Sequence, residues 1–328
     1  MTNTYQPKVV FLDQASFGER IDFKVLSSIT PRFTSFEETV KEDVLERCKD
    51  AHIVITNKVP IDGNTIAAAK NLQLICVAAT GTNNVDHHAA SARNIPICNV
   101  THYGTPSITQ HVFALILALT TKLFEYHTAV KQGDWERSTQ FCLLDYPTYE
   151  LAGKTIGIIG YGELGKRVAE LAEAFGMNIL IAQSHDSATS TRGRTPLNTL
   201  LQHSDIVTLH CPLTEQTRNL IDQAELSLMK TSALLINAAR GGIVNEHALA
   251  TALKQGVIAG AGVDVLSTEP PKAGNPLLAG PIPNLIVTPH VAWAADESRQ
   301  RIINQTRDNI VSFMNSQPRN VVNLVKAT

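Results

Sequence analysis

The chain has 328 residues, a length that fits two domains of ordinary size better than one. Hydrophobic residues make up 44% and charged residues 18%, which is the balance of a compact folded protein and not of a disordered one. The net charge of −2 gives no electrostatic reason to expect nucleic acid or an anionic membrane as a partner, and we expect neither.

Nothing in the sequence indicates secretion, membrane insertion or a bound metal. The start of the chain has no basic segment followed by an apolar run, so we expect no signal peptide. The most apolar stretch, residues 112–119, is too short to span a bilayer and is predicted as a buried helix. The adjacent His87 and His88 point in different directions on a helix and lack a carboxylate cluster, so we expect no metal there.

The cysteines indicate a reducing compartment. They are odd in number, scattered and without CxxC spacing, which argues against both a disulfide framework and a zinc site. We therefore expect the protein to be cytoplasmic. The five positions are Cys48, Cys76, Cys98, Cys142 and Cys211.

In the first third of the chain, short apolar runs alternate with amphipathic stretches, a pattern typical of a parallel sheet with crossover helices. Helices are predicted between the runs, and a single long helix is predicted over residues 107–133. The predicted strands are 9–12, 53–55, 74–77 and 96–98, and the shorter predicted helices are 35–48 and 62–70.

A second series of strands begins after residue 154 and has the six strands of a complete dinucleotide-binding fold. These strands are predicted at 155–159, 178–182, 205–209, 233–237, 258–263 and 285–287, with helices at 163–175, 246–255 and 294–316. We therefore expect an α/β protein with two doubly wound parallel-sheet domains. A Rossmann dinucleotide-binding domain (104–294) is inserted into a smaller, flavodoxin-like substrate domain built from both chain ends (1–103 and 295–328).

A glycine-rich motif, GYGELG, directly follows the predicted strand 155–159 and opens a predicted helix. This context is what a dinucleotide-binding loop requires. Gly160 permits the tight turn, Gly162 lets a pyrophosphate approach the backbone, and Gly165 lets helix and strand pack closely. The free N–H groups at the start of the helix then bind the phosphates.

The residue that would select between NAD and NADP is unusual. An acidic residue at the end of the second strand commonly holds the ribose hydroxyls of NAD, but here the strand ends in Gln183, followed by Ser184. Gln183 can bond a ribose without repelling a 2′-phosphate. Arg192 and Arg194 could meet such a phosphate, although we favour their interpretation as solvated loop residues. The choice of cofactor stays open.

Three residues with complementary chemistry follow three strands of this second series: Arg240, Glu269 and His290. The carboxyl ends of strands share one edge of a doubly wound sheet, so these side chains can converge where ligands bind. Each one alone has a structural explanation, as a turn residue, a loop charge or a core histidine. Their joint placement behind a dinucleotide loop favours catalysis.

Reduction of a 2-keto acid needs residues of these types. Arg240 can bind the planar carboxylate through two parallel hydrogen bonds. His290 can supply the proton for the developing alkoxide. Glu269 would orient the imidazole and favour its protonated form, and Asp264 is a second acidic neighbour.

Over essentially its whole length the chain resembles the D-isomer-specific 2-hydroxyacid dehydrogenase family. The motifs that carry the resemblance are GYGELG (160–165), HCPLTEQTRNLI (210–221), LLINAARGGIVNEHALATAL (234–253), GAGVDVLSTEPP (260–271) and NLIVTPHVAW (284–293). The catalytic Arg, Glu and His of the family correspond to Arg240, Glu269 and His290. The resemblance also implies a homodimer with an interface around the nucleotide domain.

The resemblance implies further contacts. The backbone of Ala79, Thr80 and Gly81 would help to hold the substrate carboxylate, and Tyr103 would line the pocket. Cofactor contacts would come from Glu163, Leu164, His210, Cys211, Pro212, Ala238, Ala239 and Asp264, in addition to the glycines, Gln183, Ser184, Arg240 and His290.

Within the family, segments 77–86, 103–117 and 141–165 look most like bacterial glycerate dehydrogenases, also called hydroxypyruvate reductases. Gln183 departs from the acidic residue usual in that subgroup. The Glu–His pair argues against a formate dehydrogenase, and an end at Thr328 without a regulatory domain argues against a phosphoglycerate dehydrogenase.

The leading hypothesis is reversible, NAD(P)H-dependent reduction of hydroxypyruvate to D-glycerate, with glyoxylate as a side substrate. One alternative keeps the chemistry but changes the substrate to lactate or another 2-hydroxy acid. The other is a non-catalytic, NADH-sensing scaffold, against which the intact Arg240, Glu269 and His290 argue.

Overall fold

The computed structural model describes residues 6–184 and 193–323. The chain divides into two compact units, one formed by Met1–Gly104 with Ala294–Thr328 and the other by Thr105–Trp293. The domain boundaries predicted from sequence each lie one residue away from these. The second unit is thus inserted into the first.

In the described residues, the first unit contains a five-stranded parallel sheet in the order β2-β1-β3-β4-β5. This order is that of a flavodoxin-like doubly wound sheet, so the predicted fold class is confirmed. Strand β2 was not predicted, because it is a half-exposed edge strand of three residues without an apolar run. The strands are β1 (Val9–Phe11), β2 (Phe33–Ser35), β3 (Ile53–Thr56), β4 (Leu74–Val77) and β5 (Ile97–Cys98).

Helices cover both faces of this sheet. The helix predicted over 35–48 is wrong in its first part, because Ser35 belongs to β2 and the helical turns begin only at Lys41. The carboxyl-terminal helix α12 (Asp296–Met314) packs against β4 and α1, which is how the two chain ends build one unit. The other helices are η1 (Gln14–Phe17), α1 (Lys24–Ser27), η2 (Lys41–Asp43), α2 (Val44–Cys48), α3 (Gly63–Ala68) and α4 (His87–Ala92).

The second unit contains a six-stranded parallel sheet in the order β11-β10-β9-β8-β6-β7, as far as the structure describes it. All six strands were predicted from the sequence. Strand order reverses between β6 and β8, and ligands of doubly wound sheets bind at the carboxyl ends of strands beside such a reversal. The strands are β6 (Thr155–Ile159), β7 (Asn178–Ile181), β8 (Ile206–Leu209), β9 (Leu234–Asn237), β10 (Gly260–Val263) and β11 (Leu285–Val287).

This sheet has one apolar core on each face. Alternate residues of a strand face opposite ways, so Ile206 joins one core and Val207 the other. Helices α5 (Thr105–Thr121) and α8 (Glu163–Ala174) contribute to the core that contains Ile206. The opposite face is covered by α9 (Leu197–His203), α10 (Gln223–Leu228) and α11 (Glu246–Lys254), and η3 (Pro276–Leu278) packs against α11.

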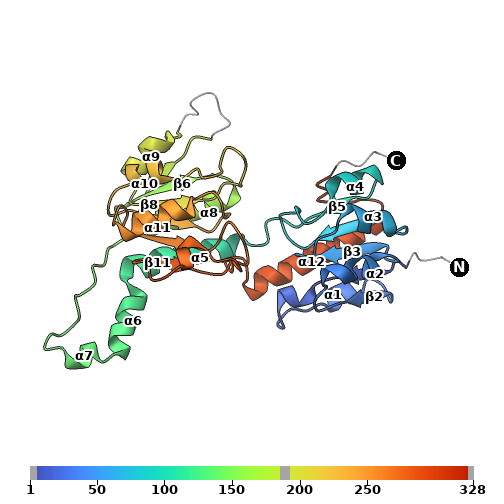
Figure 1. Cartoon of the computed structure of the whole chain (residues 1–328), viewed down its shortest axis with the longest axis horizontal. Coiled ribbons are helices and arrows are strands. Elements are labelled where there is room, and N and C mark those ends of the chain that lie inside the picture. The colour runs from blue at the N-terminus through green and yellow to red at the C-terminus, as the bar shows by residue number, and fades with distance from the viewer. Residues whose placement is uncertain (1–5, 185–192, 324–328) are drawn as a thin grey trace. The chain divides into compact units, whose positions relative to one another are not determined.

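The single helix predicted over 107–133 is wrong, because the helix breaks at Lys122. Lys122 has φ 55°, in the left-handed region, and its Nζ donates a hydrogen bond of 2.6 Å to Oδ1 of Asn284. The chain bends by 58° between α5 and α6 (Leu123–Lys131) and continues into α7 (Asp134–Arg137). In Figure 1, α6 and α7 project from the rest of this unit.

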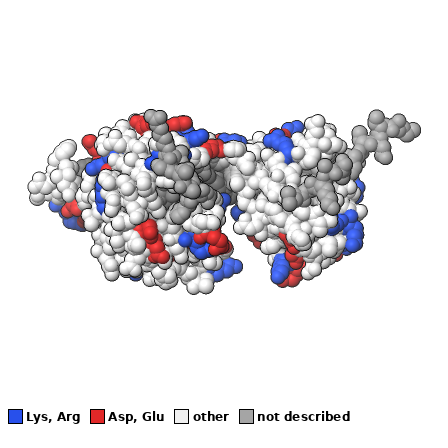
Figure 2. Space-filling model, turned by 90° about the horizontal axis from the view of Figure 1, so that it is seen from above, with Lys and Arg blue, Asp and Glu red and all other residues white. Residues whose placement is uncertain are grey.

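Neither the surface charge on the face shown in Figure 2 nor any single described helix indicates a nucleic-acid or membrane partner. On the face shown in Figure 2, acidic and basic side chains are interspersed over both units. Within the described ranges no single helix is long and apolar enough to cross a membrane, although the bent pair of α5 and α6 meets that criterion when the two are taken together.

Candidate active site

The glycine loop joins β6 to α8 at the reversal of strand order. Gly160 has φ 93°, and a Cβ there would lie 2.5 Å from the carbonyl carbon of His210, at the end of β8. A Cβ on Gly165 would lie 2.1 Å from the carbonyl oxygen of Gly160. A Cβ on Gly162 would meet nothing within 4 Å. The first and third glycines are therefore required by packing, whereas the second leaves open space beside the backbone.

The start of α8 offers hydrogen-bond donors to an anion. Gly162 is its N-cap residue and supplies no side-chain cap. The helix has 12 residues, and its dipole favours negative charge at this end. The hydroxyl of Thr105 donates a hydrogen bond to the carboxylate of Glu163. Leu164 follows within the same first turn.

A cavity of about 320 Å³ lies beside this loop and contains the residues expected to select the cofactor. Arg194 is half-buried in it, with Cζ 5.0 Å from the centre of the Tyr161 ring and Nη1 donating to the carbonyl of Ala182 at 3.3 Å. The interpretation of Arg194 as a solvated loop residue is therefore wrong. Arg192 lies outside the described residues. The cavity is also lined by Gln183, Ser184, Cys211, Pro212, Thr214 and Thr217.

His210 directly follows β8, and its backbone lies against Gly160 of the glycine loop. Its Nε2 lies 2.9 Å from Oγ1 of Thr208, and its Nδ1 is inaccessible to solvent without a hydrogen-bond partner in the described chain. Burial lowers the pKa of His210 to about 4, so the imidazole is neutral at physiological pH. Burial also raises the pKa of the adjacent Cys211 thiol. A buried nitrogen without a partner, open space at Gly162 and a helix start without a side-chain cap together fit a dinucleotide.

Glu269 and His290 are brought together at the carboxyl ends of β10 and β11. Oε2 of Glu269 lies 2.6 Å from Nδ1 of His290, and Oε1 accepts a hydrogen bond of 2.8 Å from the backbone N–H of Leu266. Both side chains are about a third exposed, at 34% and 35%. With Nδ1 held by the carboxylate, Nε2 is the ring nitrogen available to a ligand.

Asp264 is buried at the end of β10 and bonds the segment that follows β11. It is 1% exposed, and its carboxylate accepts hydrogen bonds from the Thr288 hydroxyl (2.5 Å) and from the backbone N–H groups of Val291 and Ala292 (2.9 Å each). The backbone N–H of His290 donates to the carbonyl of Asp264 at 2.8 Å. Asp264 therefore fixes the segment that carries His290, and a cofactor contact by its carboxylate stays a prediction.

Arg240 is exposed in the loop after β9, and the side chain of Asn237 bonds the backbone of this loop. Asn237 donates to the carbonyl of Arg240 at 3.0 Å and accepts from the N–H of Ala239 at 3.1 Å. Nη1 of Arg240 donates a hydrogen bond of 2.7 Å to the carbonyl of Ala239 in the same loop. Ala238 and Ala239 are buried, so only their backbone is suited to cofactor contacts.

The residues expected to bind substrate in the first unit follow β4. Thr80 and Gly81 are exposed, and their backbone N–H groups have no hydrogen-bond partner in the described chain, as an anion-binding segment requires. Ala79 is buried, and the hydroxyl of Thr80 donates to the carbonyl of Val100 at 3.0 Å. The carbonyl of Tyr103 accepts from Arg301 Nε at 2.8 Å. The substrate contacts of these residues stay predictions.

Sequence reasoning missed two residues of this region, His111 and Thr288. Nε2 of His111, on α5, lies 3.0 Å from Oγ1 of Thr288, which in turn bonds Asp264. A single histidine on an apolar helix carries no local signal of such a contact. Thr288 could have been found, because it lies two residues before His290.

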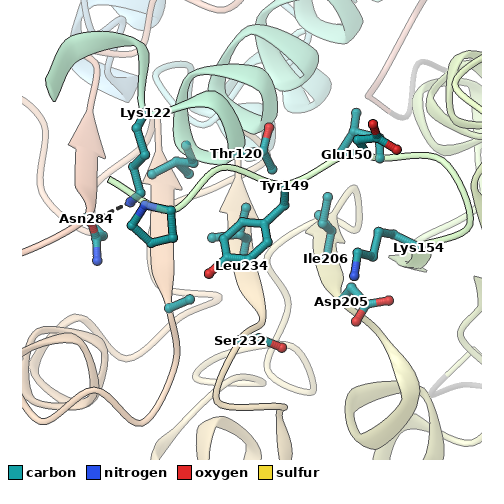
Figure 3. A pocket seen from close by; sticks show the side chains of 14 residues that line it. Thr120, Lys122, Tyr149, Glu150, Lys154, Asp205, Ile206, Ser232, Leu234 and Asn284 are labelled. Atoms are coloured by element: carbon teal, nitrogen blue, oxygen red, sulfur yellow. Dashed lines mark hydrogen bonds between the residues drawn. The ribbon is translucent and has the colours of Figure 1, made fainter. Parts of the chain in front are cut away.

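A second cavity of about 190 Å³ lies at the opposite, amino-terminal edge of this sheet (Figure 3). Ile206 and Leu234, the first residues of β8 and β9, form part of its apolar floor, and Lys122 and Asn284 lie at one end of it. Ligands of doubly wound sheets bind at the carboxyl edge. This cavity is therefore not the candidate cofactor site.

The chain is similar in sequence to known dehydrogenases and reductases. The family model described as "D-isomer specific 2-hydroxyacid dehydrogenase, NAD binding domain" matches residues 113–292. The glycerate dehydrogenase of Methylorubrum extorquens is 46% identical over 317 residues, which is 96% of this chain and 98% of that protein. The hydroxypyruvate reductase of Blautia hydrogenotrophica is 38% identical over 288 residues, which is 87% of this chain and 89% of that protein.

The chain is also similar in fold to a solved structure that contains a nicotinamide cofactor. The acyclic imino acid reductase Bsp5, in complex with NADPH and D-Arg, superposes with a TM-score of 0.80 at 28% identity. The match covers 96% of this chain and 99% of that one. The predicted fold class and the predicted nicotinamide cofactor are thereby confirmed.

Proposed function

Because the chain belongs to the D-isomer-specific 2-hydroxyacid dehydrogenase family, we propose that its reaction is the reversible reduction of hydroxypyruvate to D-glycerate. Glyoxylate is the expected side substrate. The observation that carries the proposal is the 2.6 Å contact between Glu269 and His290 at the same sheet edge as the glycine loop. The 46% identity to a glycerate dehydrogenase favours hydroxypyruvate over other 2-keto acids.

The protein's own part in this reaction is to place and protonate the keto acid. Reduced nicotinamide, when bound, supplies the hydride to the keto carbon. Nε2 of His290 donates the proton to the keto oxygen, and Glu269 keeps Nδ1 occupied and balances the charge of the imidazolium. In the oxidation direction the same nitrogen accepts the hydroxyl proton.

The substrate carboxylate is the group that distinguishes a 2-keto acid from a simple ketone. Arg240 is exposed and carries a planar fork of donors that matches a carboxylate, and its neighbour Gly241 packs against Leu266 in the loop that carries Glu269. The N–H groups of Thr80 and Gly81, which have no partner in the described chain, are proposed as further donors to it. Tyr103 is proposed to line the substrate site.

The cavity that contains Gln183 favours acceptance of NADP(H). A neutral Gln183 does not repel a 2′-phosphate, and the half-buried Arg194 offers it a positive charge in the same cavity. The related imino acid reductase was solved with NADPH. We therefore propose that the enzyme uses NADPH at least as well as NADH.

A homodimer is proposed from the exposed apolar residues of the segment formed by α6, α7 and the loop after them. Phe141 is 94% exposed and Leu144 is 84% exposed, which is unfavourable unless a partner covers them. Replacing both residues by Ser should convert a dimer into a monomer in sedimentation velocity. An unchanged dimer would show that this segment is not the interface.

We propose a cytoplasmic location and a small-molecule substrate as the partner. All five cysteines are free, which suits a reducing compartment. On the face shown in Figure 2, acidic and basic side chains are interspersed, and the net charge of −2 offers no general attraction to nucleic acid.

The direct test is a panel of glyoxylate, pyruvate and hydroxypyruvate, each assayed with NADH and with NADPH. Hydroxypyruvate should give the highest kcat/KM, and His290→Asn should abolish turnover while cofactor still binds. The highest kcat/KM with pyruvate would favour the lactate alternative. If no keto acid causes oxidation of NADH or NADPH, the proposed enzymatic function is refuted and the non-catalytic, NADH-sensing scaffold is favoured. The cellular function of such a scaffold should survive His290→Asn.

A further inference from the structure

The segment that carries His290 is held from α5 at two points. Ser107 Oγ donates to the carbonyl of Ala292 at 2.6 Å, and His111 Nε2 lies 3.0 Å from Oγ1 of Thr288. Ser107 and His111 are four residues apart, so they lie on one face of the helix, one turn apart. One face of α5 therefore contacts the chain on both sides of His290.

The direction of the hydrogen bonds fixes the protonation of His111. The Thr288 hydroxyl has a single hydrogen, and the carboxylate of Asp264, 2.5 Å away, can only accept it. Oγ1 of Thr288 must therefore accept from His111, so Nε2 of His111 carries a hydrogen. The same N–H lies 3.5 Å from Oδ1 of Asp264, close enough to add to the stabilisation of that buried carboxylate.

Asp264 in turn bonds the backbone of His290 and of the two residues that follow it. Its carboxylate accepts from the N–H groups of Val291 and Ala292, and its carbonyl accepts from that of His290. His290 has φ 54°, a left-handed conformation that is unfavourable for a residue with a side chain and persists where the surrounding structure holds it. The hydrogen bonds that Asp264 accepts from residues 290–292 hold the segment in this conformation.

We propose that His111 is a positioning residue, which acts through Thr288 and Asp264 to hold the imidazole of His290 in its productive place. The inference rests on the proposed role of His290 as proton donor. It assigns to α5 a part in catalysis, although His111 itself touches none of the reacting atoms.

The test compares His111→Phe, which keeps a ring but removes the donor, with His111→Gln, which restores an N–H at similar reach. With hydroxypyruvate, His111→Phe should lower kcat about tenfold, the equivalent of one hydrogen bond to a charged network. KM and the NADPH Kd, measured by fluorescence, should change less than about twofold. His111→Gln should recover most of kcat. His203→Phe, on the far helix α9 with its ring exposed, is the matched control and should be unaffected.

A double-mutant cycle with Thr288→Val decides whether the contacts act in series. If they do, the double variant should be no slower than the slower single variant. Three outcomes would overturn the proposal. The reductions in kcat of His111→Phe and Thr288→Val could multiply in the double variant. His111→Gln could lose as much kcat as His111→Phe, or His111→Phe could keep the full kcat of the wild type.

A spectroscopic measurement separates this inference from the proposed reaction. In NMR spectra of ¹⁵N-histidine-labelled protein, His111 should show the Nε2–H form, with a hydrogen that exchanges slowly with solvent. Thr288→Val should make that hydrogen exchange faster and should also shift the His290 signals. Unshifted His290 signals would overturn the inference even if the wild type reduces hydroxypyruvate. Loss of all keto-acid reductase activity in the wild type would instead refute the proposed reaction.

Discussion

Gly241 and Leu266 are in such close contact that a Cβ on Gly241 would lie 1.9 Å from the carbonyl oxygen of Leu266. Gly241 follows Arg240 directly, and the N–H of Leu266 donates to Glu269. The loop that carries the guanidinium is thereby packed against the loop that carries the carboxylate. Residues distant in sequence are held in register by backbone contact and not by side chains alone.

Gly241→Ala should therefore separate these loops. The expected cost is about 1–3 kcal/mol of unfolding free energy, as for other overpacked sites, with a loss of kcat/KM of at least tenfold. Gly162→Ala is the control, because a Cβ there meets nothing within 4 Å and should leave thermal stability unchanged while weakening cofactor binding. Thermal denaturation and cofactor titration check both variants; a fully stable Gly241→Ala would contradict the packing.

Gln183→Asp should shift cofactor preference toward NADH. A carboxylate in the cavity repels a 2′-phosphate and accepts hydrogen bonds from the ribose hydroxyls. The ratio of kcat/KM for NADPH to that for NADH should fall about tenfold or more, and Arg194→Gln should lower it in the same direction. An unaltered ratio in both variants would mean that these side chains do not face the ribose.

Glu269→Gln should lower kcat about tenfold to a hundredfold while leaving KM for hydroxypyruvate nearly unchanged. Gln can still hold Nδ1 of His290, so the variant removes the charge that balances the imidazolium and largely keeps the orientation. Steady-state kinetics give the two parameters. A variant as fast as the wild type would show that the carboxylate only orients the ring.

His210 should make stability depend on pH. Its pKa is about 4 in the folded protein and near 6.5 when unfolded, so the unfolded state binds more protons between these values. Its contribution is present above pH 6.5 and is lost as pH falls toward 4, by at most about 3 kcal/mol. Melting temperatures of wild type and His210→Gln at pH 7.5 and pH 5 check this. Between pH 7.5 and pH 5 the melting temperature of the wild type should fall more than that of His210→Gln. Equal falls in melting temperature would mean that the His210 ring is solvated.

Much of the nucleotide-binding unit was predictable because its signals are local. The apolar runs of β6 to β11 and the spacing of Gly160, Gly162 and Gly165 depend on neighbours in sequence, and the structure shows the packing that each glycine permits. Arg240, Glu269 and His290 were singled out because parallel strands bring their carboxyl ends to one edge.

The errors arose where distant contacts decide the local structure. Lys122 breaks a helix that its sequence favours, because Asn284 holds its side chain and the helix ends there. Arg194 looks like a loop residue until the ring of Tyr161 is placed beside it. His111 has no neighbour in sequence that reveals Thr288, and only the fold brings the two together.

Transfer of an isotope label tests the central claim most directly. NADPH with deuterium at both C4 positions of the nicotinamide ring is incubated with hydroxypyruvate and the enzyme, and the product is analysed by mass spectrometry and NMR. We predict D-glycerate with one deuterium at C2, formed by the wild type and not by His290→Asn. Glycerate without deuterium, or consumption of NADPH independent of the keto acid, would contradict direct hydride transfer at this site.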